Sequence, residues 1–348
     1  MIGCDASLVL SRRELIASAA AALAISSPPA HATVAPTMLI SHPAFAGHDP
    51  GPLSAERPAR MRAIDQALSD PRFAALVRRE APLRDDAEEA ILRAHDRQHL
   101  ERVRAAALDK AHLPFSFDGD TVVAAGTWEA AMRAVSAGLM GVDAVMDSSS
   151  GIKAVFCQVR PPGHHAEAQR TMGFCLFSNV AISGLYARVR HGAERIAVVD
   201  FDVHHGNGTQ RIFWSDRSLF YGSTHEMPLF PGTGALNETG VGNIFNAPLK
   251  AGDGGIAFRS AMKERILPAL DAFRPDLILI SAGFDAHDGD PLAHLRLFEA
   301  DFAWVTAELM SLAARHCRGR IVSMLEGGYE LDALGRSTAA HVATLMGA

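Results

Sequence analysis

Five short apolar stretches of this chain each run directly into a group of polar residues. They cover residues 153–157, 195–199, 218–222, 276–281 and 320–325, and residues 38–40 form a similar first stretch. Stretches with a helical pattern separate most of them, at residues 180–190, 256–273 and 301–316. Alternating strands and helices are typical of a parallel sheet with helices on both faces. The sequence therefore predicts an α/β fold whose polar strand ends lie along one edge of the sheet.

The composition fits one large globular domain. The chain has 348 residues, of which 48% are hydrophobic and 21% are charged, and its net charge is −6. Four further stretches, at residues 59–68, 73–80, 87–108 and 127–146, read as helices, and no repeat or long linker is present. We predict one catalytic domain over residues 37–348. With this net charge, no electrostatic footprint for nucleic acid appears, and the cysteines Cys157, Cys175 and Cys317 imply no disulfide framework.

Residues 1–32 have the pattern of a signal peptide. Arg12 and Arg13 precede a short apolar run, which ends in small residues around Ala30-His31-Ala32. The paired arginines resemble a twin-arginine export signal, with an ordinary secretory signal or an uncleaved tail as the alternatives. We expect a periplasmic or secreted protein if the signal is used, and a cytoplasmic one otherwise. No stretch is long and apolar enough for a stable membrane span.

A metal site is predicted where the second of the five strands ends. The apolar run at 195–199 is followed by Asp200-Phe201-Asp202-Val203-His204. Side chains two apart in an extended segment point to the same side, so Asp202 and His204 can converge on one ion. Ligands bind in open α/β sheets just beyond the carboxyl ends of the strands.

Six sequence motifs give the chain a resemblance to a known family. RPPGHHAE, GFC, DFDVHHGNGTQ, FPGTG, SAGFDAH and EGGY occur in this order between residues 160 and 329. Together they resemble the histone deacetylase family, which includes bacterial histone-deacetylase-like amidohydrolases and acetylpolyamine amidohydrolases. The resemblance implies an arginase–deacetylase fold, a three-layer α/β/α sandwich around a central, mainly parallel eight-stranded sheet.

The resemblance also implies the metal ligands and the catalytic residues. The zinc ligands are Asp202, His204 and Asp285, and Fe²⁺ or Co²⁺ can also serve such an oxygen-rich site. The tandem histidines supply acid–base chemistry and electrostatics, their partners orient the rings, and a tyrosine stabilises the oxyanion. The resemblance assigns the acid–base role to His165 and the electrostatic role to His164. Asn207 then orients His165, Asp200 orients His164, and Tyr329 is the tyrosine. The adjacent His205 is expected to take no part in the chemistry.

Further positions match the family's substrate tunnel. Phe174 and Phe230, with Gly173, resemble the aromatic walls around an acyl-lysine chain, although such rings also suit core packing. Asp118 is assigned to the rim carboxylate that holds the substrate backbone, and Asp120 competes for this role. Arg60 resembles the arginine near the family's internal acetate pocket.

The family implies two monovalent cation sites as well, usually for K⁺. Most of the ligands are backbone carbonyls. The first site matches Asp200, Asp202, His204, Ser223 and Thr224, and the second matches Phe213, Asp216, Leu219 and Asn243.

The sequence thus predicts a zinc-dependent amidohydrolase acting on the linear amide of acetyl-lysine or a related small acylated amine. An acetylpolyamine amidohydrolase is one alternative, and a non-catalytic acyl-lysine-binding module is an alternative of another class. A ureohydrolase of the arginase type needs a second bridging aspartate near Asp285, where Ala286-His287 follows instead. The pattern leaves the oligomeric state open.

Overall fold

The structure, a computed structural model, describes residues 36–347 and contains a central sheet of eight parallel strands. The strands follow one another across the sheet in the order β2-β1-β5-β10-β9-β6-β7-β8. Their bounds are Thr37–Ser41 (β1), Val77–Glu80 (β2), Ala154–Cys157 (β5), Ile196–Asp200 (β6), Leu219–Glu226 (β7), Ile244–Leu249 (β8), Leu277–Ala282 (β9) and Ile321–Leu325 (β10). A two-stranded hairpin, Phe115–Ser116 (β3) and Val122–Val123 (β4), stands apart from the sheet.

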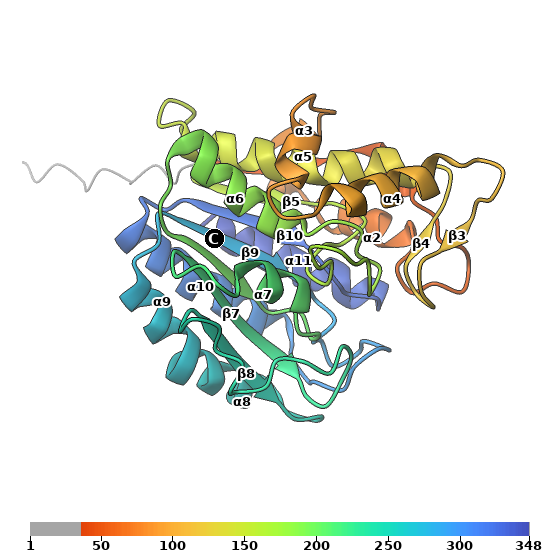
Figure 1. Ribbon diagram of the computed structural model, residues 1–348. Coiled ribbons are helices and arrows are strands. Elements are labelled where there is room, and N and C mark those ends of the chain that lie inside the picture. Colours follow the sequence, from red (N-terminus) through yellow and green to blue (C-terminus); the bar gives the residue numbers. More distant parts are fainter. Residues whose placement is uncertain (1–35, 348) are drawn as a thin grey trace, which may run out of the picture. The chain divides into compact units, whose positions relative to one another are not determined.

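Helices cover both faces of the sheet, as Figure 1 shows. One layer contains α3 (Ala87–Ile91), α4 (Arg97–Leu108), α5 (Thr127–Met146) and α6 (Asn179–His191). The other contains α8 (Gly255–Ala261), the π-helical turn η3 (Met262–Ile266), α9 (Leu267–Phe273), α10 (Glu299–His316) and α11 (Leu331–Leu345), with α2 (Ala59–Ala67) against α11. The remaining elements are η1 (Pro43–Gly47), η2 (Pro71–Phe73) and α7 (Asn207–Phe213). The predicted three-layer α/β/α sandwich is confirmed.

The central strands form because both of their faces are buried. Every residue of β6 and β9 is buried, and both strands are rich in isoleucine, leucine and valine. Continuous apolar runs of this kind suit a sheet that helices cover on both sides. All six predicted strands are present within a few residues of their expected bounds, and β7 extends to Glu226, so that residues 223–225 lie in the strand rather than after it.

The helix predicted over 73–80 was wrong, the one over 87–108 is interrupted, and several elements, among them α7, β8, α11 and the β3–β4 hairpin, were missed. Residues 77–80 form β2, because pairing with β1 holds this charged, exposed edge segment extended. The stretch 87–108 is broken into α3 and α4, and between them His95 bonds to the backbone of Glu167 and Ser178. The edge strand β8 escaped prediction because it contains Pro248, which only an edge strand tolerates, and α11 was also missed.

The parallel arrangement brings the segments after β5, β6, β9 and β10 to the same edge of the sheet. This edge holds the polar residues that the sequence placed at strand ends. None of the helices in residues 36–347 has the length and hydropathy that crossing a bilayer requires. The predicted signal peptide at 1–32 lies outside the described residues and stays a prediction.

Candidate active site

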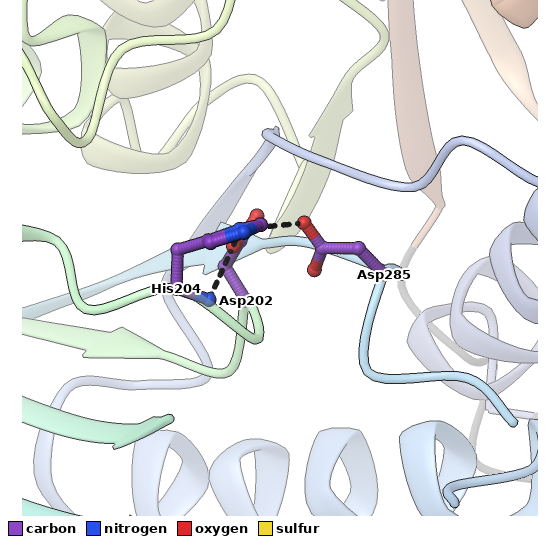
Figure 2. Close-up of side chains that lie close together, drawn as sticks. All are labelled: Asp202, His204 and Asp285. Carbon is purple, nitrogen blue, oxygen red and sulfur yellow. Dashed lines mark hydrogen bonds and ion pairs between the residues drawn. The ribbon is translucent and has the colours of Figure 1, made fainter. Parts of the chain in front are cut away.

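Three predicted metal ligands meet at the carboxyl edge of the sheet. Asp202 and His204 follow β6, and Asp285 follows β9. The Nδ1 atom of His204 lies 3.2 Å from Oδ1 of Asp202 and 3.2 Å from Oδ2 of Asp285. Figure 2 shows the three side chains close together. All three residues are buried. Their ligand atoms therefore converge on one point although the aspartates are distant in sequence.

Backbone groups orient the two carboxylates. The N–H of Gly327 donates to Oδ2 of Asp202 at 2.8 Å, and the N–H of Val203 donates to Oδ1 of Asp285 at 2.8 Å. Each carboxylate keeps its other oxygen toward the imidazole of the triad. A Cβ atom on Gly283 would lie 2.0 Å from Oδ2 of Asp202, so this close approach requires glycine.

The three side chains fit a divalent metal ion. Tetrahedral ligands with bonds of about 2.0–2.1 Å stand about 3.3 Å apart, close to the separations in the triad. Burial, with the carboxylate of Asp202 beside it, raises the pKa of Asp285 to about 7. Two buried carboxylates that both lie 3.2 Å from Nδ1 of His204 need a cation beside them if both are to stay ionised. One imidazole and two carboxylates suit Zn²⁺ and also Fe²⁺ or Co²⁺.

A buried glutamate holds the loop of the tandem histidines. Oε2 of Glu326 accepts hydrogen bonds from the N–H groups of Gly163 at 2.6 Å and His164 at 3.1 Å, and Oε1 accepts from the hydroxyl of Ser281 at 3.0 Å. Nδ1 of His164 lies 3.1 Å from Oδ2 of Asp200, the predicted partner. The contacts tie the loop after β5 to β9 and β10.

His165 has a different partner, which fixes its tautomer. Its Nδ1 lies 2.8 Å from Oδ1 of Asn207, and Nδ2 of Asn207 donates to Oε1 of Glu167 at 2.8 Å. Because the carboxylate takes the amide N–H, the amide oxygen faces the imidazole and accepts from Nδ1. The proton therefore sits on Nδ1, and Nε2 keeps a lone pair.

The two adjacent imidazoles carry different charges. Burial opposes charging of His164, but the carboxylates of Asp202 and Asp200 outweigh it and raise its pKa to about 10. Burial and the charge of His164 lower the pKa of His165 well below the usual value for histidine. At neutral pH this tandem pair therefore consists of one imidazolium and one neutral imidazole that can accept a proton.

Asp290 and Arg60 hold Tyr329 in place. Oδ2 of Asp290 accepts its backbone N–H at 2.7 Å, and the guanidinium of Arg60 lies 5.0 Å from the centre of its ring. Arg60 also donates to the carbonyl of Gly328 at 2.7 Å, where φ is +118°, a conformation that requires glycine. Burial raises the pKa of Tyr329 well above its usual value, so the phenol keeps its proton.

A cavity of about 250 Å³ opens onto these groups. The ring of Phe230 lies 5.0 Å from that of His165, and the ring of Phe174 lies 5.8 Å from that of Tyr329. A Cβ on Gly173 would come within 2.5 Å of the His165 ring. The lining residues are Asp120, His165, Gly173, Phe174, His204, Leu229, Phe230, Leu292 and Tyr329. Both predicted aromatic walls thus border the cavity.

The two aspartates considered for the rim, Asp118 and Asp120, have different surroundings. Oδ1 of Asp118 accepts the N–H groups of Asp120 and Thr121, and Oδ2 accepts the Thr121 hydroxyl at 3.1 Å. These bonds hold the β3–β4 turn together. Asp120, the competing candidate, lines the cavity next to His165 and Tyr329, whereas Asp118 borders only the wider groove beside it.

The two predicted cation sites have different surroundings. In the first, Asp200 pairs with Ser223 in the β6–β7 register, so the segments around Asp202, His204 and Thr224 are neighbours, and the site stays a prediction. In the second, the side-chain amide of Asn243 lies among three carbonyl oxygens, those of Phe213, Asp216 and Leu219.

Several buried residues at the site were not assigned from sequence. Oε1 of Glu56 lies 3.1 Å from Nη1 of Arg60, and Oε2 accepts from Nη2 of Arg160 at 2.6 Å. The Tyr221 hydroxyl donates to Oδ2 of Asp200 at 3.0 Å. Arg160 opens the RPPGHHAE motif, but Glu56 and Tyr221 stand in no motif and gave no signal.

His205 faces away from the metal triad. Its Nδ1 lies 2.7 Å from the hydroxyl of Thr233, and its Nε2 lies 3.0 Å from Oε1 of Gln210. Both ring nitrogens thus hold the Phe230 loop and α7, and the expectation that this histidine takes no part in the chemistry stays a prediction.

Comparisons with known proteins identify the family. The histone deacetylase domain model matches residues 54–345. Histone deacetylase 14 of Arabidopsis thaliana, a chloroplastic protein, is 38% identical over 84% of this chain and 72% of its own length. The histone deacetylase-like amidohydrolase of Pseudomonas aeruginosa is 37% identical over 83% and 74%. The crystal structure of the HDA15 HD domain, 33% identical, covers 90% of this chain and 89% of its own with a TM-score of 0.83. The chain therefore belongs to the histone deacetylase family.

Proposed function

We propose that this protein is a zinc-dependent amidohydrolase that removes an acetyl group from acetyl-lysine or a related acylated amine. The proposal rests on one observation above all. A neutral histidine, a protonated tyrosine and His204 of the metal-binding triad line one cavity that two aromatic rings border. Its relatives include a histone deacetylase-like amidohydrolase and a protein named as a probable deacetylase.

The apolar walls and the metal triad define where the substrate lies. The methylene chain of an acylated amine fits between Phe174 and Phe230, with the amide at the bottom of the cavity. When bound to Asp202, His204 and Asp285, a divalent ion supplies a Lewis acid for the acyl carbonyl and for the attacking water.

The remaining residues move protons and stabilise charge. Nε2 of His165 takes a proton from the attacking water, and the Tyr329 hydroxyl donates to the oxyanion that forms. The imidazolium of His164 adds a fixed positive charge beside the reacting centre. His165 then gives its proton to the departing nitrogen, the amide C–N bond breaks, and an amine and a carboxylic acid leave.

Two substitutions test the chemistry. We expect Tyr329→Phe to lower kcat on a fluorogenic acetyl-lysine substrate by about 10²–10³-fold, because one oxyanion donor is lost. His165→Ala removes the base and should lower kcat by about 10²–10⁴-fold. Steady-state kinetics on acetyl-lysine peptides and acetylpolyamines measures both effects and ranks the substrate classes by kcat/KM.

Tyr186→Phe is the matched control. Tyr186 lies on α6 and bonds to Asp143 and Arg84, away from the cavity, so this variant should keep wild-type kcat. The proposed mechanism is wrong if His165→Ala or Tyr329→Phe, folded as judged by circular dichroism, retains wild-type turnover on every substrate.

Removal of the metal gives an independent test. We expect dialysis against dipicolinate to abolish activity and Zn²⁺, Co²⁺ or Fe²⁺ to restore it, because Asp202, His204 and Asp285 then hold an ion again. Asp285→Asn loses one anionic ligand and should need a higher metal concentration. Full turnover by protein whose metal content, measured by mass spectrometry, is negligible would rule out a metal-dependent reaction.

The pH dependence tests the role of Asn207. The base works only when neutral, so kcat/KM falls as the pH drops through the pKa of His165, which is depressed. Asn207→Asp places a carboxylate beside Nδ1, which favours the imidazolium and raises this pKa. We therefore expect the acid limb of the profile to move upward by about one pH unit or more. An unchanged acid limb in a folded, active variant would show that another group sets it.

The rim aspartates provide a matched pair. Asp120 borders the cavity with an unshared carboxylate, so Asp120→Ala should lower kcat/KM for peptide substrates about tenfold, through a lost charged hydrogen bond, and leave the melting temperature unchanged. Asp118→Ala should instead lower the melting temperature, because Asp118 holds the turn. The reverse pattern would return the substrate-binding role to Asp118.

A further inference from the structure

Three backbone carbonyls converge on the side-chain amide of Asn243. Its Nδ2 atom lies 2.6 Å from the oxygen of Leu219, 2.9 Å from that of Phe213 and 3.1 Å from that of Asp216. Asn243 is only 4% exposed, so water has little access to this cage of three oxygens. The amide has two hydrogens for three acceptor oxygens, so the site has more acceptors than the amide has hydrogens to donate.

The cage is negative because of where its carbonyls lie. Phe213 is the last residue of α7, and carbonyls at the end of a helix lack helical partners and carry the negative end of its dipole. The oxygens of Phe213 and Asp216 also accept the N–H groups of Asp216 and Leu219 through tight turns. Such a cage attracts a cation or a hydrogen-bond donor.

The orientation of the Asn243 amide is fixed by its other end. Oδ1 accepts the N–H of Val241 at 3.1 Å, so the NH₂ group must face the carbonyls. Gly240, at φ +56°, wraps around this oxygen, and a Cβ there would lie 2.7 Å from it. The backbone oxygen of Asn243 meanwhile accepts the N–H of Tyr221. The loop before β8 thus holds the amide in the cage.

These residues do not fit the monovalent ion that the family resemblance implies. Backbone carbonyls bind K⁺ by surrounding it in place of its hydration shell, and here they surround a nitrogen atom. The ion and the nitrogen cannot occupy the same place. We propose that the Asn243 amide replaces the second monovalent cation in this protein, so that the cage binds no K⁺ and the segment after α7 is held to β8 by a side chain. This inference is independent of the proposed hydrolytic activity.

Thallium, an anomalous scatterer that mimics K⁺, tests the proposal directly. Crystals of the full chain grown or soaked with Tl⁺ should show no anomalous peak between the oxygens of Phe213, Asp216 and Leu219. A peak there in the wild-type protein, with the Asn243 amide turned away, would overturn the proposal. The same crystals of Asn243→Ala should show a peak, because removal of the amide opens the cage.

Thermal unfolding provides the second measurement. Asn243→Ala removes the amide that donates to the three carbonyls and leaves their remaining lone pairs unmatched, so its melting temperature should fall in tetramethylammonium chloride and recover in KCl at equal ionic strength. We expect the gain in KCl to exceed that of the wild type by about 3 °C or more. Asn243→Ser serves in the same assay if the alanine variant does not fold.

Asn246→Ala is the matched control. Asn246 is also buried and lies in β8 opposite Ser223 of β7, but its amide donates to the side chain of Gln210 at 2.7 Å and to the carbonyl of Glu238 at 3.3 Å, not to a carbonyl cage. Its loss should destabilise the protein without increasing the effect of K⁺. If Asn243→Ala and Asn243→Ser gain no more from K⁺ than Asn246→Ala, the amide does not stand in for a cation.

Discussion

The hydrogen bond from the Gly327 backbone to Asp202 ties the parts of the site together. An ionised carboxylate taken out of water is costly unless charged or hydrogen-bonding partners meet it. Asp202 meets this requirement through backbone N–H groups and through the imidazoles of His204 and His164. Since these partners follow β5, β6 and β10, burial of one charge fixes three strand ends relative to one another.

The same requirement explains why glutamates and arginines lie together in the buried network beside the metal triad. Burial opposes ionisation of Glu56, but the guanidinium of Arg160 and the ring of His48 outweigh it and hold the pKa of Glu56 well below its usual value. Arg60 extends this network to the backbone of Glu326 and to the ring of Tyr329. The network that neutralises buried charge therefore also positions catalytic groups, so damage to it affects stability and turnover together.

The sequence predicted the central strands and the metal triad because both have strong local signals. Buried strands are continuous apolar runs, and motifs such as SAGFDAH mark Asp285. The signal failed where tertiary contacts decide, as in the charged edge strand β2, which pairing with β1 holds extended. The choice between Asp118 and Asp120 depends on which carboxylate accepts the backbone hydrogen bonds of the β3–β4 turn. Likewise, a carbonyl ligand at Asn243 was predicted from position, whereas the side chain decides what fills the cage.

The two tandem histidines show how little sequence separation is needed for opposite roles. Their ring centres lie 4.0 Å apart and both are buried, so burial alone would lower both pKa values. Asp200 offers His164 a carboxylate, whereas Asn207 offers His165 a neutral oxygen. The first imidazole therefore holds a proton, and its charge helps to keep the second one neutral. Environments that push two pKa values apart separate a fixed charge from a proton acceptor, and here the carboxylates of Asp202 and Asp200 act on His164, whereas a neutral amide faces His165.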